Sequence, residues 1–153
     1  PLLKSIDLEN IKLPSINLSN LKKLEKLWLK GNRLVSIKLK DNTLLNYLDL
    51  GENDIESLDV SMLPLLEELR CNKNKLKSLD LSENKKLKII NLKNNDFSAC
   101  SLNQLFLSVN PPLEVNNGFA IGENPGATTS NTKIAKDKGW RLDVEGDGSA
   151  VCQ

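Results

Sequence analysis

The chain has 153 residues, contains no histidine, and has only six aromatic residues: two Trp, one Tyr and three Phe. Without histidine, Ser-His-Asp and Cys-His nucleophile systems, histidine-ligated zinc and the usual near-neutral proton shuttle are excluded. The three cysteines, Cys71, Cys100 and Cys152, lack the CxxC spacing that is typical of zinc sites. We therefore predict no catalytic site, no metal site and no cofactor.

Long apolar runs and an excess of one charge are also missing. The 21 basic residues nearly balance the 20 acidic ones, giving a net charge of +1, so we expect no nucleic-acid partner. No stretch is apolar enough to be a membrane span, and no signal peptide is recognisable. Because the opening "PLLKSIDLEN" already belongs to the repeat pattern described below, we expect a trimmed fragment from which an export signal has been removed.

What the sequence does contain is a period of 21 residues, repeated five times without an insertion. A period of this length is typical of a solenoid, in which no single repeat can bury its own apolar edge. The apolar columns are Leu3, Leu24, Leu45, Leu66 and Leu87; Ile6, Leu27, Leu48, Leu69 and Ile90; Leu8, Leu29, Leu50, Cys71 and Leu92; Leu13, Leu34, Ile55, Leu76 and Phe97; Ile16, Ile37, Leu58, Leu79 and Cys100; and Leu18, Leu39, Val60, Leu81 and Leu102.

One further column is polar, and its members are Asn32, Asn53, Asn74 and Asn95, with Ile11 at the corresponding place in the first repeat. The segment L-x-x-L-x-L before each asparagine alternates like a short strand with its leucines pointing inward. An amide at the end of the strand can pair backbone groups of the turn and bridge one coil to the next. The L-x-x-L-x-L after it predicts an extended return segment.

Two cysteines stand in apolar columns, Cys71 and Cys100. Free cysteine is among the most buried residue types, so we predict that both are small apolar core residues. The alternatives are a reactive thiol or a disulfide between Cys100 and Cys152.

The segments "LEKLWLKGNRL", "LNYLDLGENDI", "LEELRCNKNKL" and "LKIINLKNNDF" resemble leucine-rich repeats of the LxxLxLxxNxL type. The period of 21 with "SLDLS" or "SLDVS" resembles the repeats of surface proteins of Bacteroidetes and of internalin-like proteins. The resemblance implies a β-rich leucine-rich-repeat solenoid: a right-handed coil with parallel strands on its concave side and extended return segments.

The tail departs from the period after Asn103. "SLNQLFLSV" predicts a short helix stopped by prolines, and "GFAIGENPG" predicts a strand followed by a turn. "SNTKIAKDKGW" predicts a helix with Ser130 as N-cap, Gly139 as C-cap and Ile134 and Trp140 facing inward, and "WRLDV" predicts a final strand. We therefore divide the chain into five repeats over residues 3–107 and a small α+β C-terminal cap over residues 108–153.

The tail segment "NPGATTSNTKIAKDKGW" resembles the closing segment of Bacteroidetes repeats, which covers the last coil. Many relatives have a cysteine where this chain has Ser130, so the resemblance leaves Cys152 without a family partner. "DVEGDG" from Asp143 is similar to the start of a calcium loop, but the glutamate required at its twelfth position would fall beyond Gln153.

The non-leucine positions of the strands face solvent, and neighbouring strands lie about 4.8 Å apart, so these side chains form a compact grid. Aromatic residues beside an arginine are enriched at binding hot spots. The alternative is that they only cover the strands and stack on lysine stems. The candidate ligand-binding residues on this face are Lys26, Trp28, Lys30, Tyr47, Asp49, Glu68 and Arg70.

Asp7 and Asp49 fall on either side of Trp28 in one column, about 9.6 Å apart at the backbone. That separation is close to the one between the two carboxylates of inverting glycosidases. An open surface would leave both acids near their ordinary pKa, with nothing to create a proton donor, so we predict two solvated acids and no enzyme.

The resemblance implies a non-enzymatic recognition or adhesion module that binds a protein, including a host-derived one, in an extracellular or bacterial cell-surface setting. The alternatives are a structural spacer without a ligand of its own and a carbohydrate-binding module that uses Trp28 and Tyr47 as stacking platforms. We expect a monomer with no transmembrane segment.

Overall fold

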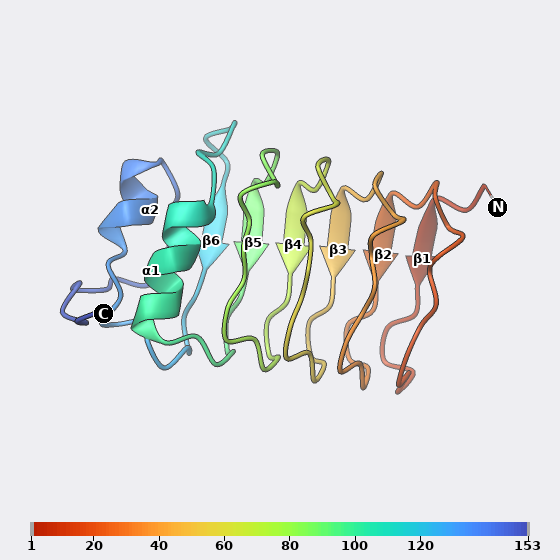
Figure 1. The fold of residues 1–153 in the computed structure, drawn as a ribbon, viewed down its shortest axis with the longest axis horizontal. Coiled ribbons are helices and arrows are strands. Elements are labelled where there is room, and N and C mark those ends of the chain that lie inside the picture. The colour runs from red at the N-terminus through yellow and green to blue at the C-terminus, as the bar shows by residue number, and fades with distance from the viewer. Residues whose placement is uncertain (1, 153) are drawn as a thin grey trace.

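The structure is a computed structural model that describes residues 2–152. Six short parallel strands lie side by side in one sheet, in the order in which they occur in the sequence (Figure 1). They are β1 (Ser5–Asp7), β2 (Lys26–Trp28), β3 (Tyr47–Asp49), β4 (Glu68–Arg70), β5 (Ile89–Asn91) and β6 (Gly118–Ala120). Between strands the chain returns along the other side of the stack, so the molecule is a parallel-strand β-solenoid.

The register of the sheet reproduces the period of the sequence. Leu27 pairs with Leu48, Leu48 with Leu69, and Leu69 with Ile90. These four side chains are at most 1% exposed, and Phe119 of β6 continues the same buried column. The predicted spine of the solenoid is confirmed.

The asparagine column is buried and joins each coil to the one before it. The Nδ2 group of Asn53 donates to the carbonyl oxygens of Leu50 in its own coil at 3.0 Å and of Leu29 in the preceding coil at 2.9 Å. Its Oδ1 accepts the backbone N–H of Leu34 at 3.0 Å. The same pattern recurs at Asn32, Asn74, Asn95 and Asn124. The predicted bridging role is confirmed.

The residue just before each asparagine of this column, or before Ile11 at the matching place in the first coil, has a positive φ. Only one of the six residues in this column is a glycine, Gly31 at φ 69°. The others are Asn10, Glu52, Lys73, Asn94 and Glu123, with φ between 53° and 64°. Most residue types pay a steric penalty there, so the turn geometry of the coil overrides local preference.

The return segments are extended, as predicted, but they do not form a second sheet. Within the described chain, residues 35–41 and 56–60 donate no backbone hydrogen bond to a neighbouring coil. The inward residues Leu39 and Val60 are nonetheless buried. The coils are therefore held together by the strands, the asparagines and the core.

At the C-terminal end, helix α1 (Ala99–Ser108) takes the place of a fifth return segment (Figure 1). Its buried Leu102, Leu105 and Phe106 continue the core, and Ser98 caps it by accepting the N–H of Ser101. The helix was predicted. Whether repeats and cap divide at residue 107 remains a prediction, since α1 crosses that point.

The strand predicted in "GFAIGENPG" is confirmed as β6, but the sequence did not reveal that the repeat resumes there after α1. Phe119, Ile121 and Asn124 occupy the places held by Leu27, Leu29 and Asn32 in the second coil. Asn124 follows Asn95 after 29 residues instead of 21 because of the inserted helix and loop. The period therefore does not end at Asn103: the sheet has a sixth strand.

The second helix, α2 (Lys133–Asp137), packs against α1 and lies beyond it at the end of the stack (Figure 1). Its N-cap is Thr132; the prediction of Ser130 was wrong, because the Ser130 hydroxyl is buried and donates to the carbonyl of Ala127. Gly139 follows the helix with φ 95°, and Trp140 is buried as predicted. The predicted final strand is reduced to a single bridge between Phe119 and Leu142.

The cysteines divide into two kinds. Cys71 is free and 1% exposed in its leucine column, as predicted, and burial raises the pKa of its thiol well above the ordinary value. Cys100 is not a core residue: it lies on α1, where the helix turns it outward, and forms a disulfide with Cys152. The alternative of a disulfide is correct, and it ties the chain terminus to the last coil.

Replacing Asn74 with alanine is expected to lower the free energy of unfolding by about 2 kcal/mol, because it leaves the buried N–H of Ile55 without a partner. The carbonyls of Leu50 and Cys71 each lose one of two amide donors and keep the other, from Asn53 and Asn95. Chemical denaturation followed by circular dichroism measures the change. The control is Asn72→Ala, two residues away on the solvent side, which is expected to stay within about 0.5 kcal/mol of the parent. Equal effects of the two variants would contradict the bridging role.

Replacing Cys152 with serine is expected to lower the stability of the C-terminal end, because the disulfide closes a sequence separation of 52 residues. The loop-entropy relation gives about 4 kcal/mol for a loop of this size. Thermal unfolding with and without reductant measures the effect. Reductant should destabilise the parent and leave Cys152→Ser unchanged; an unchanged parent that is fully reduced by mass spectrometry would contradict the prediction.

Candidate functional site

The solvent-facing side of β1–β6, called the strand face below, carries columns of side chains that run from strand to strand. The central column runs Asp7, Trp28, Asp49, Arg70, Asn91 and Ala120 from β1 to β6. A second column, two residues earlier in each coil, contains Lys26, Tyr47 and Glu68 side by side. The predicted site residues therefore lie together, on β2, β3 and β4, with Lys30 just after β2.

Trp28 and Tyr47 form the largest feature of the strand face. Their ring centroids are 4.9 Å apart and their planes are tilted by 35°. Both side chains are partly exposed, although they touch each other diagonally across two strands. A contact of this kind is worth about 0.5–1.5 kcal/mol, and it holds both rings in one position before any ligand arrives.

Charged side chains surround the two rings. Arg70 donates from Nε to Glu68 Oε1 at 2.6 Å, and its Nη2 lies 2.5 Å from the same oxygen. Lys30 lies 3.6 Å from Glu52, whereas Lys26 is exposed. The face thus combines an apolar centre with charges of both signs.

Asp49 differs from the sequence prediction. It is only 7% exposed, and its Oδ1 accepts the N–H of Gly51 at 2.9 Å. Burial raises the pKa of Asp49 above its ordinary value, against the lowering effect of the Gly51 hydrogen bond and of Arg70. The prediction of two solvated acids holds for the exposed Asp7 and was wrong for Asp49, because neighbouring side chains cover it.

The strand face becomes a groove at its C-terminal end. The outward positions of the sixth coil hold only Gly118, Ala120 and Gly122, beside the longer Ile89 of β5 and the chain at 141–143. The resulting groove encloses about 320 Å³, which is within the usual range for ligand sites. Sequence reasoning missed it, although the alternation of small residues in "GFAIGEN" is visible once that segment is recognised as a sixth strand.

Comparisons with known proteins agree with this architecture. No family model matches the chain, and no curated protein matches it. Among solved structures, an internalin (InlF) from Listeria monocytogenes superimposes with a TM-score of 0.74 at 18% identity, covering 89% of this chain and 39% of that one. The fold is that of the leucine-rich repeat proteins.

Further leucine-rich repeat structures are similar. Internalin C2 from Listeria monocytogenes is 30% identical over 63% of this chain and 44% of its own, with a TM-score of 0.61. A leucine-rich repeat protein from Leptospira interrogans is 24% identical over 92% of this chain and 48% of its own, also with a TM-score of 0.61. The chain spans less than half of the length of each of these three structures.

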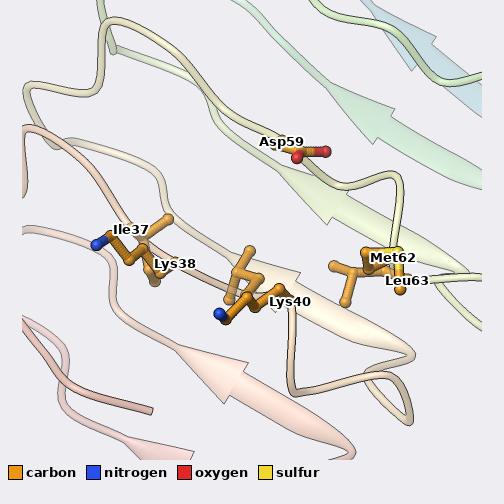
Figure 2. Close-up of a pocket in the computed structure, with 7 residues that line it drawn as sticks. Ile37, Lys38, Lys40, Asp59, Met62 and Leu63 are labelled. Carbon is orange, nitrogen blue, oxygen red and sulfur yellow. The ribbon is translucent and has the colours of Figure 1, made fainter. Parts of the chain in front are cut away.

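The return face of this leucine-rich repeat solenoid has a smaller cavity, between two coils that share no backbone hydrogen bonds there (Figure 2). Ile37 and Leu63 contribute apolar surface, and Lys38, Lys40 and Asp59 lie at its edges (Figure 2). It encloses about 190 Å³, below the usual size of a ligand site. Size does not decide between the two faces, because other hollows on the return side enclose between about 340 and 490 Å³. We place the candidate site on the strand face because the aromatic pair and the charges around it lie there.

The described residues show neither a cluster of metal ligands nor a membrane-spanning helix. Residues 2–152 contain no group of three or more Cys, Asp or Glu side chains placed to hold a metal ion. The helices in that range are too short and too polar to cross a bilayer. What the strand face presents is shape, aromatic surface and charge.

Asp49 supplies a test of the electrostatics of this face. Because the pKa of Asp49 is raised on folding, the folded chain binds this proton more tightly than the unfolded chain does. The free energy of unfolding therefore falls as the pH rises from below about 3.9 through the folded-state pKa. Asp49→Asn keeps the acceptor for Gly51 and removes this loss. It is expected to raise the stability at pH 7 relative to the parent.

Thermal unfolding between pH 3 and pH 7 measures the difference. Asp7→Asn, in the same column but exposed, is the matched control and is expected to leave the stability near that of the parent. A destabilised Asp49→Asn at pH 7, or the same pH dependence in parent and variant, would contradict the raised pKa of Asp49.

Proposed function

We propose that this chain is a non-enzymatic protein-binding module, used for recognition or adhesion, of a bacterial secreted or cell-surface protein. The observation that carries the proposal is the partly exposed Trp28–Tyr47 pair next to Arg70, at the centre of a rigid sheet. Trp, Tyr and Arg are the residues that most often dominate the binding energy of protein interfaces.

The architecture favours binding because the site is already ordered. Each ring is fixed to a strand whose neighbours are paired on both sides and whose inward residues are buried. A preorganised surface loses little conformational entropy when a partner docks. The similarity of fold to internalins supports a protein partner. A host-derived partner and a monomeric module are part of the proposal.

The disulfide supports the proposed location. The partly exposed Cys100 and the exposed Cys152 form a disulfide at the surface of the molecule. Such bonds persist in oxidising surroundings outside the cytoplasm and are rare in the reducing cytosol of mesophiles. The surface setting of the proposed module is therefore consistent with its own chemistry.

A carbohydrate ligand is the second candidate, because two neighbouring aromatic rings could stack on the apolar faces of sugar rings. The third is a spacer without a ligand. Both are outcomes of the experiment that follows.

The test compares three proteins: the parent, Trp28→Ala, and Met62→Ala as the matched control. Met62 is 53% exposed and lies on the return face, so its loss removes a large apolar side chain far from the strand face. Each protein is applied to a panel of purified extracellular-matrix and cell-surface proteins and to a glycan array. The indole N–H signals report binding directly, since the chain has two tryptophans and Trp140 is buried against Asn110.

Binding of the parent to a protein that weakens at least tenfold in Trp28→Ala but not in Met62→Ala would support the proposal. A loss of tenfold corresponds to about 1.4 kcal/mol, within the range for one hot-spot residue. A glycan signal that vanishes with Trp28 would favour the carbohydrate module. Absence of binding to every surface, or binding that is equal in all three proteins, would favour the spacer.

A further inference from the structure

The groove at the C-terminal end of the strand face is bounded on both long sides. Its floor is β6, where Gly118 and Ala120 leave the backbone nearly bare. On one side stand Ile89 and Asn91 of β5, and on the other the chain at Arg141 and Asp143, aligned by the bridge between Phe119 and Leu142. The walls are two strand spacings apart, about 9.6 Å, which is the width of one extended polypeptide.

The far wall is a built part of the structure. The Oδ1 of Asp143 accepts the N–H of Ile121 at 2.7 Å, and the carbonyl of Arg141 accepts the N–H of Phe119 at 2.8 Å. Asp143 also pairs with Lys93 at 3.1 Å, across Gly122. This ion pair uses the charges of both residues.

Among the groove residues that the structure describes, the unpaired charge is the guanidinium of Arg141, because Arg70 is paired with Glu68 and Asp143 with Lys93. Arg70 and Arg141 line it from opposite sides, and Arg141 makes no ion pair with any residue between 2 and 152. The nearby carboxylates are already engaged, Glu68 by Arg70 and Asp143 by Lys93. Arginine is the side chain best suited to hold a carboxylate through two parallel hydrogen bonds.

The apolar content of the groove suits a peptide as well. Ile89 is 37% exposed at its edge, and nothing lies within 4 Å of the place where a Cβ atom of Gly118 would stand. A side chain that points down from an extended peptide would therefore enter free space beside an aliphatic contact.

From this arrangement we propose that the groove between Arg70 and Arg141 binds an extended acidic segment of a protein partner, with an aspartate or glutamate side chain on Arg141. The inference rests on the proposed protein-binding function and specifies a second contact point, next to the Trp28–Tyr47 pair on the same face. The partner would meet the aromatic pair over β2 and β3 and lay its acidic segment along β6.

The experiment uses the arginine Nε–H signals of the labelled full chain. The sequence has three arginines, Arg33, Arg70 and Arg141, and Arg33 lies outside the groove, so it is an internal control. The probe is a blocked peptide of alternating Glu and Val. The comparison probes are its Gln-for-Glu counterpart, the Gln peptide with a free C-terminal carboxylate, and an oligosaccharide of uronic acids.

The acidic peptide is expected to shift Arg70 and Arg141 and to leave Arg33 in place. Arg141→Gln should weaken the interaction at least tenfold, because it removes the charge that holds the carboxylate through two parallel hydrogen bonds. Gly118→Val should abolish it by filling the floor, while the strand keeps its stability because the added side chain meets no neighbour. Arg33→Gln is the matched charge control and should bind like the parent.

Equal shifts of all three arginines would overturn the proposal, since they would show diffuse charge attraction alone. It is also overturned if the Gln peptide, the free C-terminus or the uronic acids shift Arg141 as strongly as the acidic peptide, or if Gly118→Val still binds. A protein ligand that depends on Trp28 but not on Gly118 or Arg141 would leave the proposed function standing and remove only the groove.

Discussion

The buried asparagine ladder is the constraint on which the rest of this structure depends. Each coil must turn sharply after its strand, and the turn leaves backbone groups inside the stack. Asn53, Asn74 and their equivalents pair those groups within one coil and across to the coil before it. Because the return segments share few hydrogen bonds, the ladder and the strands set most of the spacing of the coils, together with the core and the bridges that Asn42 and Asn84 make to the preceding coil. The regular grid of the strand face is a consequence of that spacing.

Much of the fold was predictable because the period carries it. The columns of Leu27 and Asn32 placed the spine and the ladder, and the register followed from the constant step. The sixth turn was hidden because α1 and its loop lengthen the step and Gly126 packs against Ala99 where a leucine would be expected. The Cys100 error has the same origin: its column stops being an extended segment where the helix begins.

The site was predictable to the extent that it follows from alternation. Trp28, Tyr47 and Arg70 lie together as expected because outward positions of successive strands must align. The burial of Asp49 could not be deduced, since it depends on how the larger side chains around it lean over the sheet. The groove depends on Gly118, Ala120 and Gly122, which have little or no side chain. Small residues of this kind do not indicate a groove until their strand is placed as the sixth of the sheet.

The left-handed turn residues have one more consequence. Glu52, Lys73 and Glu123 hold a backbone conformation that suits glycine or asparagine, at roughly 1 kcal/mol each. Replacing these residues with glycine or asparagine could therefore increase the stability of the fold, at positions whose side chains are not part of the core or the asparagine ladder. Such substitutions could be made one coil at a time, by evolution or by design. The added stability would allow destabilising substitutions on the strand face. Gly31 differs from these positions because it already is a glycine, and a Cβ atom there would stand 1.9 Å from the side-chain Oδ1 of Asn10.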